Sequence, residues 1–185
     1  QGAALTTAQI AARTNAQVGA IAVDDISKLS NAQIAALSAG QAGALTSAQL
    51  AALSTAQLAA IEPADIAGLS TSAIRGLTTA QIVALTTAQA AALTPTQVAA
   101  LTPVQVGALA TNDLQQLAAD RIAALSTAQA AALKSTQLAA LSTDQVSALE
   151  TADLAAITAT TIKSLTTAQA AALSASQVGA LTSAQ

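Results

Sequence analysis

The residues of this chain that could do chemistry are its carboxylates and its many serine and threonine hydroxyls. The sequence has nine Asp and Glu residues but no His and no Cys, so the commonest general base and the thiolate nucleophile are both missing. A hydroxyl needs a neighbouring base to act as a nucleophile, and none accompanies the Ser and Thr residues. We therefore predict no catalytic residues and no enzyme.

The adjacent carboxylates Asp24 and Asp25 are the most obvious candidate for a cation site. Calcium takes about six to eight oxygen ligands, often from a glycine-containing loop such as D-x-D-x-D-G, and the sequence has no such loop. We assign both carboxylates to a solvated surface or a helix cap, and the dipeptide Asp120–Arg121 to a surface ion pair. No metal site and no cofactor site are predicted.

Composition also limits the partners of the chain. The net charge is -3 and the aromatic fraction is 0%, so there is neither a basic surface nor a stacking platform for nucleic acid. No apolar run reaches the roughly 18 residues that a membrane-spanning helix needs. We expect no nucleic acid, no membrane span and no small-molecule ligand.

An eight-residue repeat must position whatever side chains this protein uses. From Thr6 to Leu181 the chain divides into 22 complete octads without an insertion, and partial units lie at both ends. Position one is Ser or Thr in 17 of 23 octads, position four is Gln in 16 of 23, and position eight is Leu in 19 of 23. We therefore predict one continuous domain over residues 1–185.

Each octad matches a break in the chain followed by a short helix. In a continuous helix, successive octads would rotate the apolar stripe by roughly 80°, and the abundant Ala disfavours a β-solenoid. Ser or Thr at position one and Gln at position four instead form a capping box, as in the pairs Thr86–Gln89 and Thr94–Gln97. All three prolines stand at position two, the first helical residue, where proline is tolerated.

Such short helices are unstable alone, so the octads must stack. The predicted fold is an all-α solenoid, a superhelix of very short helices, with one helix per octad and a capping box at each start. Positions five and eight supply a Leu, Ile and Val interior, whereas Thr, Ser and Gln are expected outside. The predicted structural core includes Leu37, Leu53, Leu85, Leu101, Leu125 and Leu141.

A second period overlies the octads, because shifting the sequence by 88 residues superposes unusual residues on one another. Asp replaces Gln at position four in octads that this shift relates, such as those of Asp65 and Asp153. Either a block of sequence was duplicated, or the second period is near 44 residues, five and a half octads, so that roughly five to six octads complete one superhelical turn and align the unusual octads along one side.

In the second case, charged residues of neighbouring octads would meet as lateral or register contacts. Exposed pairs of this kind contribute only about 0–1 kcal/mol, so a role in register is favoured over one in stability. The residues concerned are Glu62 and Asp65 with Arg75, and Glu150 and Asp153 with Lys163.

Two resemblances rest on these octads. LTPTQVAAL and LTPVQVGAL resemble the opening of the repeats in TAL effectors of plant pathogens, but the second helix and the base-reading pair are absent, so DNA reading is not implied. Over its whole length, the ALTTAQ-type octad resembles large, repetitive, secreted or surface, adhesin-like proteins of Gram-negative bacteria. That resemblance implies export to the cell surface or the extracellular medium, and a structural or adhesive role.

The sequence favours a structural protein that forms an extracellular filament or the stalk of a bacterial surface protein by stacking its octads. The partner would be the protein itself, through end-to-end or lateral assembly. The first and last octads are close to consensus, so we expect further octads in a longer chain or end-to-end stacking of subunits. The alternatives are a glycan- or peptide-binding solenoid and an ice- or surface-binding protein.

Overall fold

The computed structural model describes residues 5–185, and its regular structure in that range is helical throughout. It contains 22 helices of four to six residues, one for each complete octad, and no strand among the described residues. The predicted short-helix solenoid is therefore confirmed. The chain forms two compact units, Gln1–Leu93 and Thr94–Gln185, and each is described by itself.

The first unit contains helices α1 to α11. Their bounds are α1 (Thr7–Ala11), α2 (Asn15–Gly19), α3 (Val23–Ile26), α4 (Asn31–Ala35), α5 (Ala39–Gly43), α6 (Ser47–Ala52), α7 (Thr55–Ala59), α8 (Pro63–Ile66), α9 (Thr71–Arg75), α10 (Thr79–Val83) and α11 (Thr87–Ala92).

The second unit contains helices α12 to α22. Their bounds are α12 (Pro95–Ala100), α13 (Pro103–Ala108), α14 (Thr111–Gln116), α15 (Ala119–Ala123), α16 (Thr127–Ala131), α17 (Ser135–Ala140), α18 (Thr143–Ala148), α19 (Thr151–Ala156), α20 (Ala159–Ile162), α21 (Thr167–Ala171) and α22 (Ala175–Ala180).

The helices end after one or two turns because the backbone is extended at position one of the next octad. Thr86, which precedes α11, has φ -74° and ψ 152°, and its side chain accepts a hydrogen bond from the Gln89 amide. Thr94 caps α12 in the same way, and Pro95 follows it as the first helical residue. Both pairs form complete capping boxes.

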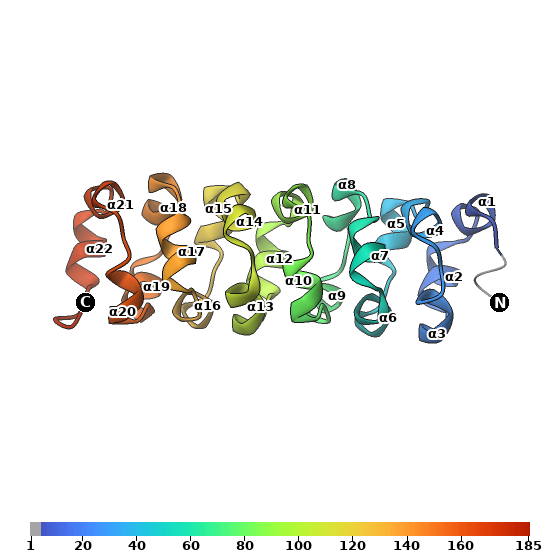
Figure 1. Cartoon of the computed structure of the whole chain (residues 1–185), viewed down its shortest axis with the longest axis horizontal. Helices are drawn as coiled ribbons and strands as arrows, with labels where there is room; N and C mark the ends of the chain where they lie inside the picture. Colours follow the sequence, from blue (N-terminus) through green and yellow to red (C-terminus); the bar gives the residue numbers. More distant parts are fainter. Residues whose placement is uncertain (1–4) are drawn as a thin grey trace. The chain divides into compact units, whose positions relative to one another are not determined.

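Three octads make one turn of the solenoid in each unit. In the first unit α2 packs on α5, α5 on α8 and α8 on α11; in the second unit α13 packs on α16, α16 on α19 and α19 on α22. Figure 1 shows α15, α18 and α21 following one another along the upper edge of the second unit. The expectation of five to six octads per turn is therefore wrong.

The interior of each turn is built from positions five and eight. Position-five residues such as Leu58 and Leu138 are fully buried, at 0% exposure. The position-eight residues pack beside them and complete the interior. The six leucines that were predicted for the core are all buried, with exposures of 5% for Leu37, 4% for Leu53, 6% for Leu85, 3% for Leu101, 4% for Leu125 and 4% for Leu141.

Position six faces the next turn closely enough to restrict side-chain size. A Cβ added to Gly43 would lie 2.6 Å from the carbonyl oxygen of Gly68, on the turn that follows. Two polar side chains at position six bond to the equivalent carbonyl of the next turn: Ser147 Oγ donates to Ala172 O at 2.9 Å, and Gln115 Nε2 donates to Ala140 O at 2.9 Å. Most position-six residues are Ala or Gly, in keeping with this close approach.

We predict that Gly43→Ala destabilises the protein by about 1–3 kcal/mol, because the new methyl group must displace the backbone of the next turn. The matched control is Gly179→Ala, since a Cβ at Gly179 would meet nothing within 4 Å. Alanine favours a helix over glycine by about 0.5–1 kcal/mol, so the control should be neutral or stabilising. Urea unfolding of both variants measures the difference, and equal effects would contradict the close approach.

Candidate functional site

The glutamines at position four are the most regular polar feature of the structure, and they lie inside it. Gln89 is 0% exposed, Gln129 is 1% and Gln137 is 2%. The expectation that glutamine lies outside with Ser and Thr is therefore wrong. A buried carboxamide is costly unless its donor and its acceptor are both bonded, so the partners of each amide decide whether the octad is stable.

Each buried glutamine in this series uses its two amide atoms in different directions. In Gln89, Oε1 accepts from the Thr86 backbone N–H at 3.0 Å, which completes the capping box. Its Nε2 atom donates to the carbonyls of Leu58 and Ile61, both at 2.8 Å. Those carbonyls end a helix four octads earlier, so one side chain starts its own helix and ties it to the previous turn.

The same arrangement recurs in both units, with acceptors 28 and 31 residues upstream. In the first unit it joins Gln41 to Ile10 and Arg13, Gln49 to Val18 and Ile21, and Gln81 to Leu50 and Leu53. In the second unit it joins Gln129 to Val98 and Leu101, Gln137 to Val106 and Leu109, Gln145 to Leu114 and Leu117, Gln169 to Leu138 and Leu141, and Gln177 to Val146 and Leu149.

We call this pair of contacts the glutamine bridge. Carbonyls near a helix C-terminus lack the usual i+4 partner. The position-five carbonyl already accepts from the position-eight amide, as Leu58 O does from Ile61 N–H at 3.1 Å, and Nε2 adds a second donor to it. The position-eight carbonyl, such as that of Ile61, receives its donor from the next turn.

The octad that begins at Lys134 shows that the bridge does not require a hydroxyl at position one. Lys134 has no hydroxyl, yet its backbone N–H donates to Gln137 Oε1 at 2.9 Å, and Gln137 Nε2 still donates to the previous turn. The bridge therefore persists where half of the capping box is lost.

Four octads carry Asp at position four, and each also lacks a hydroxyl at position one. No side-chain cap bond forms at Ala22, Glu62, Ala110 or Glu150, which begin these octads. Their aspartates are Asp25, Asp65, Asp113 and Asp153; the last three are buried, with exposures of 9%, 3% and 3%.

Burial raises the pKa of Asp65 above its ordinary value, and the nearby Glu62 carboxylate raises it further. Burial likewise raises the pKa of Asp153, with a smaller contribution from Glu150, while a hydrogen bond from the Thr127 side chain acts in the opposite direction. A carboxylate has no N–H to donate, so these octads cannot make the glutamine bridge in its usual form.

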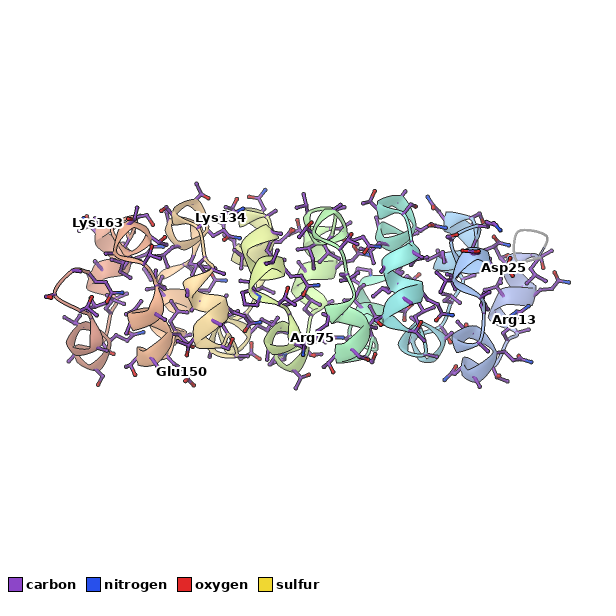
Figure 2. The ribbon with its side chains drawn as sticks, turned by 90° about the horizontal axis from the view of Figure 1, so that it is seen from below. Arg13, Asp25, Arg75, Lys134, Glu150 and Lys163 are labelled. Carbon is purple, nitrogen blue, oxygen red and sulfur yellow. The ribbon has the colours of Figure 1, made fainter. Side chains whose placement is uncertain are left out.

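The charged residues predicted to align along one side do not do so, because they belong to consecutive octads, and with three octads per turn consecutive octads lie on different sides of the solenoid. Glu150 precedes α19, which packs on α16 and α22, whereas Lys163 follows α20, which packs on α17. Figure 2 shows Glu150 and Lys163 at opposite edges of this unit.

The same correction applies in the first unit. Glu62 and Asp65 belong to the octad of α8, which packs on α5 and α11. Arg75 ends α9, which packs on α6. The predicted surface pair of Asp120 and Arg121 is present, with Arg121 Nη1 3.0 Å from Asp120 Oδ1.

Other candidate sites are few within residues 5–185. No three His, Cys, Asp or Glu side chains in this range gather where they could hold a metal ion. The helices described here, at four to six residues, are too short for a membrane span. An open pocket of about 390 Å³ is formed mainly by residues of the first three octads, and it is lined by Leu5, Ile10, Arg13, Ala20, Ile21, Ala22, Asp25 and Leu29.

These features define a repeat protein of the short-helix solenoid class. The ALTTAQ repeat matches the chain at residues 18–55, 58–95, 106–143 and 146–183, which together make up most of its length. The chain therefore belongs to the ALTTAQ repeat family, and its role is that of a structural repeat. The third and fourth matches begin 88 residues after the first and second, which is the long period seen in the sequence. No curated protein matches the chain.

We predict that Gln145→Glu is far more damaging than Gln17→Glu. Glutamate keeps the acceptor that the capping box needs, but it places a carboxylate against the Leu114 and Leu117 carbonyls. Leaving a buried polar group unpaired costs about 1–3 kcal/mol, and more for a charge. Gln17 is exposed and, among residues 5–185, makes the cap contacts alone, so it is the matched control. Similar losses in urea unfolding for the two variants would contradict the bridge.

Proposed function

We propose that this chain is a structural segment that builds an extracellular filament, or the stalk of a bacterial surface protein, by stacking octads. The observation that carries the proposal is the glutamine bridge, because each turn both supplies donors and offers acceptors for another turn. A structure held by identical contacts between neighbours can be extended by adding octads, as in other solenoids.

The outermost turns support assembly through the same contacts. Gln9 and Gln17 are exposed, and their Oε1 atoms already accept from Thr6 and Thr14. Their Nε2 atoms are the donors that would bridge to a preceding turn. At the other end, Val178 is 52% exposed and Leu181 is half-buried.

The carbonyls of Val178 and Leu181 occupy the positions to which a bridging glutamine of a following turn would donate. Donors at one end and acceptors at the other suit a head-to-tail contact, and a contact of that kind that does not close produces a filament. Octads of the same chain or of a second copy would satisfy the same groups.

Composition agrees with exposure outside a cell. The chain has no Cys and no Met, so it has neither of the side chains that oxidise most readily. Its 15 charged residues produce little repulsion between stacked copies. The prediction of one continuous solenoid belongs to the same proposal, and small-angle X-ray scattering of the whole chain tests it.

Sedimentation velocity over a dilution series tests assembly directly. We expect concentration-dependent oligomers of the 17.9 kDa chain, and weaker association for the double variant Gln9→Ala/Gln17→Ala, which removes two Nε2 donors. Thr7→Ala/Thr79→Ala is the control, because these exposed position-two residues take no part in the bridge. A chain that stays monomeric at every soluble concentration, or a double variant that associates as the native chain does, would overturn self-assembly.

A further inference from the structure

The octad Glu150–Ile157 places an acidic side chain where its neighbours place an amide donor. Asp153 is 3% exposed, and its Oδ2 atom is buried without a hydrogen-bond partner among the described residues. By the register of the bridges, the main-chain carbonyls that face position four of this octad are those of Ile122 and Leu125. The carboxylate of an ionised Asp153 can only accept hydrogen bonds, and it therefore faces carbonyl oxygens that can also only accept them.

We propose that this octad is a pH-dependent clasp between turns, open to the extent that Asp153 is ionised and closed when Asp153 is protonated. A protonated carboxyl, like a carboxamide, carries both a donor and an acceptor. Protonation would thus let Asp153 donate its O–H toward the Leu125 or Ile122 carbonyl, where Gln145 and Gln177 donate in the adjoining bridges. The inference concerns stability alone and does not depend on the proposed function.

The helix of Asp153, α19, packs on α16 and α22, and neither of those helices contains Asp, Glu, Lys or Arg. The octad that contributes the Ile122 and Leu125 carbonyls also carries Asp120 and Arg121, which pair with each other at 3.0 Å. On the octad of Asp153, Glu150 adds a second negative charge, and the Thr127 hydroxyl from α16 donates to the Asp153 carboxylate. Removal from water and the Glu150 charge outweigh that bond, so the pKa of Asp153 is raised.

The sign of the pH effect follows from that direction. A carboxyl whose pKa is higher in the folded than in the unfolded chain binds its proton more tightly when folded. Its stabilising contribution is full below the ordinary Asp value of 3.8, and it is lost as the pH rises through the raised folded-state value. The clasp therefore closes on acidification.

Asp65 repeats the arrangement in the first unit. It follows Glu62 by three residues, its pKa is raised by burial and by that carboxylate, and its helix α8 packs on α5 and α11, which also contain no charged residue. Thr127 lies 26 positions before Asp153, whereas the residue 26 positions before Asp65 is Ala39. The first unit thus has the acidic octad without the hydroxyl.

The test compares thermal unfolding of the native chain and of Asp153→Gln between about pH 7 and about pH 4, near the ordinary Asp pKa. Asp153→Gln restores the consensus side chain, so we expect a higher midpoint than the native chain at neutral pH and a difference that shrinks as the pH falls. Asp144→Asn removes an equal charge from an exposed position of the same unit, and its difference from the native chain should stay small and constant.

Thr127→Ala supplies a second measurement, the titration of the Asp153 carboxyl. That titration would not change if Thr127 had a purely structural role. The substitution removes the hydrogen bond that favours the carboxylate, so the carboxyl titration of Asp153, followed by carbon-13 NMR, should move to higher pH. The clasp is overturned if Asp153→Gln has the same advantage at every pH, if it lowers the midpoint at neutral pH, or if Thr127→Ala leaves the titration unmoved.

Discussion

The structure depends on a single side-chain group, the buried carboxamide at position four. Its oxygen accepts from the backbone at the start of its own helix, and its nitrogen donates to the end of a helix in the previous turn, as Gln145 does with Leu114 and Leu117 at 2.8 and 2.6 Å. Helices of four to six residues are far below the roughly 12 residues that stand alone in water. The bridge and the leucine interior together supply the stability that each short helix lacks.

This dependence makes stability local and therefore extendable. An octad interacts with the turn before it and the turn after it, so a solenoid of this kind gains stability by neighbour contacts rather than from one central core. The exceptions act locally too. Where Asp replaces Gln, the hydroxyl at position one is also replaced, by Ala22, Glu62, Ala110 or Glu150, so cap and bridge are lost at the same place.

The short helices and their leucine interior could be predicted from the sequence because both arise within one octad: Thr86 reaches Gln89 across three residues. The three-octad turn could not, because the bridge from Gln145 to Leu117 spans 28 residues and an eight-residue period fixes no turn. A signal was present, however. Position four is Gln in 16 of 23 octads and never Glu, although Glu completes a capping box as well as Gln does; a donor that reaches the previous turn accounts for this preference. The 88-residue period misled, because 11 octads are not a whole number of three-octad turns.

The exchange of glutamine side-chain amide protons with solvent, measured residue by residue by NMR, tests the bridge most directly. The Nε2 protons of bridging residues such as Gln129, Gln137 and Gln145 should exchange slowly and show through-bond couplings to carbonyl carbons 28 and 31 residues upstream. Those of Gln9 and Gln17, which are exposed, should exchange rapidly. Uniformly fast exchange across the series, or couplings to any other carbonyls, would contradict the glutamine bridge.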